Sequence, residues 1–535
     1  MKRIFCALLL LTALPSFSQF KRIAESAEFH EPEEGVAKLL HLKNGNTVYV
    51  HINFKEAGFE LKIFDPSHQP VVNKVVTPAY TREGDMGLMA IFEINGDVVM
   101  LIQNYSDNKP KLYRIIIDGT TGDIKKEEKL AELEKVGWNE RRRINYEGAG
   151  PFPGFFARKD QRSDHYAIVT LNNFCSDRSK RMEIVLYGPD HKEISRAFCP
   201  AAGPKYEFLD YKDMAVIGGE KVCVLLSAFN ANMYGNRKGE MVFATLDSGA
   251  QGASAKDLTT EVKEYIDGGC VRYNPVTKKI LLVAAGRDRQ WPPVSDYDVI
   301  AAMIDPFGDP EAGKPISAQR TADGDIKSLF GKAFWRDGLP QNVYVNADGT
   351  FTVVYEAVSI STTEGQHYSV SNTTVGDISV VRYTTEGVEQ HRQVIPQSYF
   401  FRDHLLVPFH QSFEQDKAIE LYYGTQFKDF AYLDAKERSY ILINDLERNL
   451  DATKSVGKVT SIEGVKYCDG FYYPLGDGQT PAPQWLFGPA ADSEEHDLAP
   501  FPLSDYDRDR DLYITLQLAK KGTSKIAKIV WLQPQ

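Results

Sequence analysis

One loop of the chain concentrates residue types that dominate binding surfaces. It starts at Gly286 and contains Arg287, Arg289, Trp291 and Tyr297. A guanidinium can hold a carboxylate or stack on an indole ring, and tryptophan offers a large flat apolar surface. The pattern therefore predicts a recognition loop for a protein or a glycan. The alternative is that Trp291 covers a neighbouring sheet while the arginines are solvated.

Two further polar stretches extend this predicted binding set. NANMYGNRKGE contains Tyr234 and Arg237, and the longer STTEGQHYSVSNTTVGD contains His367 and Tyr368. Long loops that cluster on one face of a rigid scaffold are common recognition sites. The alternative is that these loops are long only because nothing constrains them.

A run of alternating carboxylates is the candidate metal site. Asp505, Asp507 and Asp509 could supply the hard oxygen ligands that calcium prefers. Arg508 and Arg510 occupy the intervening positions, so charge neutralisation on a solvated turn is the alternative. The sequence favours no metal, and calcium is the one candidate cofactor.

Local motifs of catalysis are absent from the sequence. It contains no G-x-S-x-G elbow, no H-E-x-x-H and no P-loop. His404 and His410 flank a predicted strand and would point to the same side of it, which makes them a candidate metal pair. A core or rim histidine is the alternative reading of each.

Cys175 and Cys199 are the candidate disulfide. A predicted strand from Met182 lies between them, and two strand spacings amount to ~9.6 Å. That exceeds the roughly 7 Å limit for bridged Cα atoms. A bridge therefore requires loop 172–181 to fold back over the sheet.

The elements that must position these loops recur along the chain. Each begins with a polar turn and continues as a strand of mostly apolar residues. The copies are NGNTVYVHI from Asn44, NGDVVMLI from Asn95, RSDHYAIVTL from Arg162, GGEKVCVLL from Gly218, TKKILLVAA from Thr277, ADGTFTVVY from Ala347, KERSYILI from Lys436 and DRDLYITL from Asp509. Such recurrence indicates a repeated all-β unit.

The residues after each copy predict a four-stranded meander. A third strand ends in an Asp-, Pro- or Gly-rich turn such as IFDPSHQP from Ile63, and a more polar fourth strand such as PVVNKVV from Pro70 comes next. Continuous apolar runs such as VCVLL indicate sheets covered on both faces. With these features the chain resembles a β-propeller. Eight blades are favoured, and seven with one insertion is the alternative.

The ends of the chain carry separate predictions. Lys2 and Arg3, the apolar stretch 4–14 and SFS before Gln19 are typical of a signal peptide over 1–18. Residues 19–535 then form a single propeller domain, with the segment from Phe20 to Phe29 closing the last blade. The C-terminal DLYITLQLAKKGTSKIAKIVWLQ fits a last propeller unit and also resembles bacterial C-terminal sorting domains. KKEEKLAELEKV, from Lys125 to Val136, is read as a helix or as an outer strand with a linker.

The composition of the chain argues against some classes of binding partner. The formal net charge of −11 argues against nucleic acid and anionic membranes. No apolar run after the leader is long enough to span a bilayer. We therefore expect a soluble exported protein, periplasmic or extracellular, that could associate with the outer membrane through a partner.

These observations favour a non-catalytic scaffold that binds a protein or glycan through its long-loop face. The alternative is a hydrolase or lyase that acts on a polysaccharide or peptide at the central channel. An enzyme should gather ionisable groups from several blades around one pocket. A scaffold should expose aromatic and polar side chains on the loop face.

Overall fold

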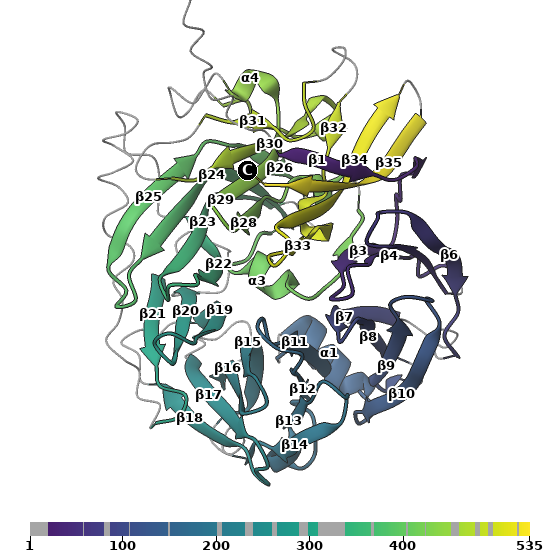
Figure 1. The fold of residues 1–535 in the computed structure, drawn as a ribbon. Coiled ribbons are helices and arrows are strands. Elements are labelled where there is room, and N and C mark those ends of the chain that lie inside the picture. Colours follow the sequence, from purple (N-terminus) through teal and green to yellow (C-terminus); the bar gives the residue numbers. More distant parts are fainter. Residues whose placement is uncertain are drawn as a thin grey trace, which may run out of the picture.

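The computed structural model shows an all-β propeller of eight blades around a central axis (Figure 1). It describes residues 20–534 except for 57, 80–85, 106–107, 148–149, 201–205, 231–238, 259–264, 288–297, 309–337, 365–368, 403–404, 423, 451–458, 477–481, 490–495 and 522–523. No described helix is long and apolar enough to cross a membrane.

In blades 1 to 4, four consecutive strands form an antiparallel sheet with the first of them nearest the axis, and in blade 1 a fifth, short strand, β27 (Ile419–Glu420), pairs with that first strand. Their strands are β3 (Val36–His41), β4 (Thr47–Ile52), β5 (Phe59–Phe64) and β6 (Pro70–Val76); β7 (Met86–Ile94), β8 (Asp97–Asn104), β9 (Lys111–Asp118) and β10 (Ile124–Glu132); β11 (Gly154–Lys159), β12 (Tyr166–Leu171), β13 (Met182–Tyr187) and β14 (Glu193–Phe198); and β15 (Phe208–Ile217), β16 (Lys221–Phe229), β17 (Gly239–Asp247) and β18 (Ser254–Leu258).

Blades 5 to 8 follow the same plan with variations. Blade 5 has three described strands, and in blade 8 the innermost position is shared by two short strands. The strands are β19 (Tyr265–Asn274), β20 (Lys279–Arg287) and β21 (Asp298–Ile304); β22 (Leu339–Val345), β23 (Phe351–Glu364), β24 (Ser369–Tyr383), β25 (Glu389–Ile395) and β26 (Tyr399–Phe401); β28 (Ala431–Asp434), β29 (Ser439–Asp445), β30 (Asp469–Pro474) and β31 (Gln484–Trp485); and β32 (Asp497–Leu498), β33 (Asp505–Asp507), β34 (Leu512–Lys521) and β35 (Ser524–Gln533).

The repeated sequence unit is confirmed as the second strand of a blade in all eight copies, and with it the eight-blade prediction. These strands are buried because each blade is covered by its neighbours on both faces. Every residue of β16 is buried, and its side chains pack alternately toward blade 3 and toward blade 5. The core is therefore a ring of inter-blade layers, which explains continuous apolar runs in place of alternation.

The two ends of the chain meet in blade 8. β1 (Lys21–Glu25) and β2 (Phe29–His30) pair antiparallel with β35, so the outermost strand of the last blade comes from the N-terminal part of the chain. Phe20 lies against the rings of Tyr440, Tyr472 and Tyr513 at 4.7–6.2 Å between centroids. The pairing covers a strand edge that would otherwise be open.

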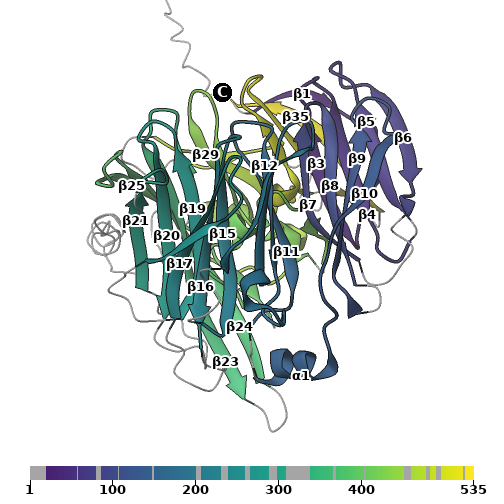
Figure 2. The ribbon, with the colours of Figure 1, turned by 90° about the horizontal axis from the view of Figure 1, so that it is seen from below.

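The two faces of the ring differ. Turns between first and second strands, and between third and fourth, lie on one face, which we call the short-turn face. Connections between second and third strands, and between blades, lie on the other, the loop face. The tips of β23 and β24 and the helix α1 (Trp138–Glu147) extend from the loop face (Figure 2).

The structure corrects two predictions from the sequence and decides between the helix and the strand predicted for residues 125–136. Most of the stretch STTEGQHYSVSNTTVGD, 361–377, predicted from the sequence as a long loop, belongs to the hairpin of β23 and β24, because Val, Ile, Ser and Thr residues pair in register from Val358 to Glu364. The segment 125–136 is the outer strand β10 and a linker, since the ladder with β9 outweighs the helix propensity of Lys and Glu. The residues after His404 form no strand, and a helix, α3 (His410–Glu414), begins at His410.

The predicted disulfide is also wrong. Neither Cys175 nor Cys199 forms a disulfide in this structure. Loop 172–181 turns toward Glu134, which lies 3.9 Å from the Cys175 sulfur. Cys199 is buried between blades 3 and 4, with its sulfur 3.7 Å from the Ser254 carbonyl oxygen. The loop does not fold back over the sheet, so the sulfurs never meet.

Candidate functional site

The central channel is crossed by residues 405–430, which we call the crossing segment. It leaves blade 6 after β26 and contains α3, the short strand β27 (Ile419–Glu420) and a 3-10 turn, Thr425–Phe427, before it enters blade 7. β27 pairs with β3 of blade 1, which blades 7 and 8 separate from blade 6 around the ring. Figure 1 shows α3 within the ring, surrounded by the innermost strands.

Backbone hydrogen bonds fix the crossing segment to several blades. The Phe409 amide donates to the Pro340 carbonyl of blade 6 over 2.7 Å, and the Ile91 amide of blade 2 donates to the Asp416 carbonyl over 2.7 Å. The Asn444 side chain of blade 7 donates to the Phe427 carbonyl over 2.8 Å. The segment is therefore a fixed partition across the channel.

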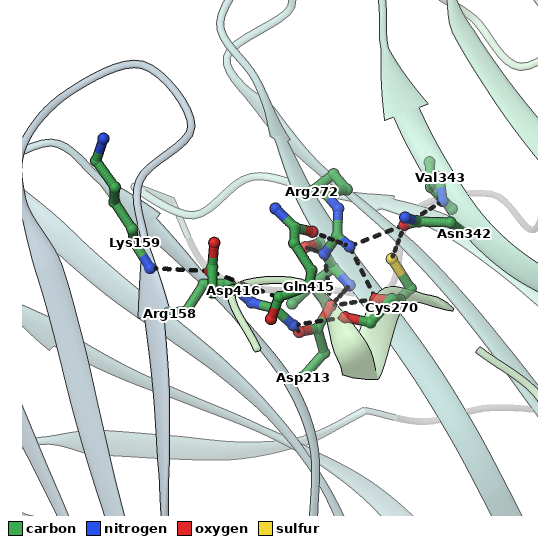
Figure 3. A network of polar contacts seen from close by, with 11 residues as sticks. Arg158, Lys159, Asp213, Cys270, Arg272, Asn342, Val343, Gln415 and Asp416 are labelled. Carbon is green, nitrogen blue, oxygen red and sulfur yellow. Dashed lines mark hydrogen bonds and ion pairs between the residues drawn. The ribbon is translucent and has the colours of Figure 1, made fainter. Parts of the chain in front are cut away.

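A buried charged network holds the middle of this partition (Figure 3). Arg158 of β11 and Arg272 of β19 donate to opposite oxygens of Asp213 of β15, over 2.5 and 2.6 Å. The side chains of all three are at most 7% exposed. Burial opposes ionisation of Asp213, but the two guanidiniums outweigh it and hold its pKa below the ordinary value.

The same two arginines bind the crossing segment. Arg158 donates to the carbonyls of Ser412 and Gln415 over 3.1 and 3.2 Å. Arg272 donates to the Ser412 hydroxyl and to the side-chain carbonyl of Gln415 over 2.8 and 2.9 Å. Asp213 thus orients the two cations that anchor the segment.

β-Bulges in the innermost strands help to aim these groups. The register of β15 shifts between Tyr211 and Asp213, and that of β22 between Pro340 and Asn342. An extra residue bends the strand locally and redirects the side chains that follow it. Asn342 then accepts from Arg272 over 2.9 Å, which ties blade 6 into the network.

On the short-turn side of the partition lies a cavity of about 1370 Å³. Its walls come from blades 1, 2, 3, 6, 7 and 8, and its floor from the crossing segment. The lining carries six Lys and Arg residues and ten Asp and Glu residues, a net charge of −4 with histidine neutral. The cavity thus gathers sixteen Lys, Arg, Asp and Glu residues from blades 1, 2, 3, 7 and 8 and from the crossing segment.

Most charges around the cavity mouth are paired with one another. Arg508 binds Asp434 and Arg510 binds Asp507, each at 2.5 Å. Lys43 pairs with Asp164, which also lies 3.6 Å from Lys159. Arg508–Asp434 and Lys43–Asp164 join different blades, whereas Arg510–Asp507 and Lys159–Asp164 each lie within one blade.

Lys38 of β3 differs from these paired cations. Its ammonium donates to the Pro502 carbonyl over 3.2 Å at the cavity wall. Burial lowers its pKa, and the nearby charges of Asp505, Asp416 and Glu414 only partly oppose that effect. Lys38 therefore gives up its proton more readily than an ordinary lysine.

His41 belongs to the seam between blades 1 and 8. Its Nε2 lies 3.3 Å from the Asp507 carboxylate, and its Nδ1 lies 3.2 Å from the Thr47 hydroxyl, which also accepts from Trp531. Burial lowers the pKa of His41 against the attraction of Asp507 and Asp505. This histidine is a structural link between the first and last blades.

The predicted metal candidates do not point to a common centre. Asp505 accepts from the His41 amide over 2.6 Å, and Asp507 is held by Arg510. The carbonyl of Asp509 accepts from Lys436 over 2.7 Å. Among the described residues no three His, Cys, Asp or Glu side chains group as metal ligands.

The predicted binding residues lie almost wholly outside the described residues. Of Arg287 only the backbone is described, as the last residue of β20. Of the predicted histidine pair, His404 lies outside the described residues. His410 is half-buried at the start of α3 and lines the cavity. The binding set that is not described comprises Arg289, Trp291, Tyr297, Tyr234, Arg237, His367 and Tyr368.

Sequence reasoning did not find the crossing segment or the charged network. A signal was present in FFARK, YKDMA and CVRYN, where a charged residue interrupts an apolar first strand in three successive blades. Charges are rarely buried unless they are paired. Three such interruptions at matching positions predict a cluster on the axis.

A second buried carboxyl lies near the loop face. Asp445 at the end of β29 accepts at Oδ1 from the Leu446 amide and the Asn449 side chain, over 2.7 and 2.6 Å, while its Oδ2 makes no hydrogen bond. Burial raises the pKa of Asp445 to about 7. This group caps the turn into α4 (Glu447–Leu450) and lies apart from the cavity.

Asp445 should make stability depend on pH. The folded protein keeps this proton up to about pH 7, while the unfolded chain releases it near ~3.9. The folded state thus binds more protons in that window, so its stability falls as pH rises through it. Urea unfolding of wild type and Asp445→Asn from pH 4 to 8 should show the variant gaining relative stability with pH. Parallel curves would contradict this.

Comparison with known proteins assigns no family and no function. No family model and no curated protein matches the chain. Solved structures with a similar fold include polysaccharide lyase Uly1, with 10% identity, 96% of this chain and 100% of the other covered and a TM-score of 0.37. A eukaryotic initiation factor has 10% identity, coverage of 92% and 86% and a TM-score of 0.38. The α-L-arabinanase of Penicillium chrysogenum has 9% identity, coverage of 62% and 94% and a TM-score of 0.32.

The chain is thus an eight-bladed β-propeller with a partitioned axial channel. Its likeness to these structures is one of fold and gives no function.

Proposed function

We propose that this propeller binds a neutral glycan and that one end of the glycan lies in the axial cavity. The supporting observation is the cavity of about 1370 Å³ with a lining of net charge −4. A negative lining repels nucleotides, uronates and sulfated sugars. The volume exceeds the ~300–1,000 Å³ typical of pockets for a single small molecule. A chain of several neutral sugar units fits both properties.

The lining offers the groups that a hydroxyl-rich ligand needs. Glu414, Asp416 and Gln411 supply carboxylate and amide groups at the floor. Tyr344 and Tyr432, half-buried in the wall with ring centroids 4.4 Å apart, supply aromatic surface. Sites for small polar ligands usually combine aromatic walls with a few placed polar groups.

Binding is favoured over chemistry because the charges at the mouth are engaged with one another. The hydrolase or lyase alternative rests on Lys38, whose lowered pKa would suit a proton acceptor at the cavity wall. The binding proposal and the enzyme alternative differ in whether the protein forms shorter products from a neutral polysaccharide, and in whether Lys38→Met abolishes their formation. Products that form with wild type and vanish with the variant would favour the enzyme.

Titration calorimetry with neutral hexasaccharides tests the proposal. Gluco-, manno- and xylo-oligosaccharides represent the predicted class, with oligogalacturonate as the anionic comparison and a hexalysine peptide as the cationic one. We expect at least one neutral series to bind and oligogalacturonate not to bind. Glu414→Gln should weaken that binding by about 10-fold or more, because a hydrogen bond to a charged group contributes roughly 1.5–3 kcal/mol.

Glu386→Gln is the matched control, since Glu386 lies on an exposed turn of blade 6 outside the cavity. It should bind like wild type. Equal affinities for wild type and Glu414→Gln, or binding of hexalysine alone, would overturn the proposal. The loop-face binding residues predicted from the sequence remain a separate prediction.

A further inference from the structure

The helix α1 on the loop face has no role in the core. It follows β10 of blade 2 and precedes β11 of blade 3, and none of its described side chains is buried. Figure 2 shows it at the loop-face end of the molecule, below the blades. A helix that buries no apolar stripe gains little from packing. Its exposed Trp138 and Arg142 are thus available to contact a partner.

Trp138 at the start of α1 is 72% exposed. The guanidinium of Arg142 lies 5.9 Å from the centre of its ring. Phe152, just after the helix, is a second exposed aromatic at 42%. Exposed tryptophan beside arginine is the composition of interface hot spots.

The charge around α1 is opposite to that of the whole protein. Arg143 donates to the Glu207 carboxylate over 2.9 Å, and Arg181 of loop 172–181 donates to the Glu207 carbonyl over 2.7 Å, so helix and loop lie side by side. Residues 134–143 and 175–181, with Glu207, contain seven Lys and Arg residues and four Asp and Glu residues. This surface has a net charge of +3 on a chain of −11.

We propose that α1 and loop 172–181 form a docking surface for an acidic segment of a partner protein, with an apolar side chain of that segment on Trp138. Arginine clusters recognise acidic motifs through charge-assisted hydrogen bonds. Arg141, Arg142 and Arg143 are successive helix residues, so they point in directions about 100° apart. A flexible peptide can wrap around them, whereas a flat surface reaches only one or two. This proposal is independent of the axial cavity, which opens on the other face.

Fluorescence anisotropy with a labelled peptide tests the docking surface. The probe is a dodecapeptide of Asp and Glu with one central phenylalanine, and its Asn and Gln counterpart is the control ligand. We expect the acidic peptide to bind and its affinity to fall as salt rises. Trp138→Ala and the double variant Arg142→Glu/Arg178→Glu should each weaken binding by about 10-fold or more, in line with hot-spot and charge-reversal effects.

Lys192→Glu is the matched charge reversal, because Lys192 is 83% exposed in a turn on the short-turn face. It should bind the peptide like wild type. Trp138→Ala should also leave the urea midpoint unchanged, since the residue packs in no core. Peptide affinity unaffected by the α1 variants, or no peptide binding at low salt, would overturn the proposal. Binding of heparin without binding of the peptide would overturn it in favour of an anionic glycan.

Discussion

Replacing Asp213 with alanine is expected to lower the free energy of unfolding by about 3–5 kcal/mol, the cost of leaving a buried charge without its partner. Asp213 is 1% exposed and is the shared acceptor of Arg158 and Arg272. Its removal leaves the two buried guanidiniums without their shared carboxylate, and only Arg158 keeps a nearby carboxylate, that of Asp416 at 3.8 Å. The crossing segment should loosen as well, because both arginines also hold Ser412 and Gln415.

Urea unfolding measures this change, and proteolysis within residues 405–430 reports the loosened segment. Asp123→Ala is the control, because Asp123 pairs with Lys74 on the surface with 71% of its side chain exposed. Exposed pairs contribute about 0–1 kcal/mol. If Asp213→Ala were as mild as this control, the network would not be what anchors the partition.

Replacing Phe20 with alanine is the second large effect that we expect. Phe20 is 4% exposed and packs against tyrosines of blades 7 and 8 where the chain ends meet. Removing a buried phenylalanine side chain costs about 3–5 kcal/mol through lost transfer energy and the cavity left behind. The variant should show a lower urea midpoint and faster amide exchange in β35, whose edge β1 covers.

Ile23→Ala is the matched control, because Ile23 lies in β1, which begins directly after Phe20. Ile23 is 41% exposed, so its truncation removes little buried surface. A loss of less than about 1 kcal/mol is expected there. If both variants lost equal stability, β1 would act by strand pairing alone and the aromatic contact of Phe20 would carry no extra weight.

The sequence was enough to predict the propeller, because its blades are built from local patterns. A polar turn followed by an apolar run marks each second strand, as in GGEKVCVLL from Gly218. The number of blades follows from the number of these patterns. Strand pairing within a blade joins residues close in the chain. The helix interpretation of 125–136 stayed open because Lys and Glu favour helices, while a solvent-exposed outer strand tolerates them.

The cavity and its partition could not be predicted in the same way. Arg158 meets residues 412–416 from more than 250 positions away, and no local pattern records that contact. The crossing segment itself reads as an ordinary connection with short apolar stretches. Its course is decided by partners on blades 1 to 7, which only the closed ring brings together.

The most direct test of the proposed function is the location of a bound neutral oligosaccharide. A crystal structure of the protein with the hexasaccharide that binds best in titration should show sugar density in the axial cavity, against Glu414 and Asp416 of the crossing segment and the rings of Tyr344 and Tyr432. Sugar density on the loop face or the outer blade edges, with the cavity holding only solvent, would contradict the proposed function.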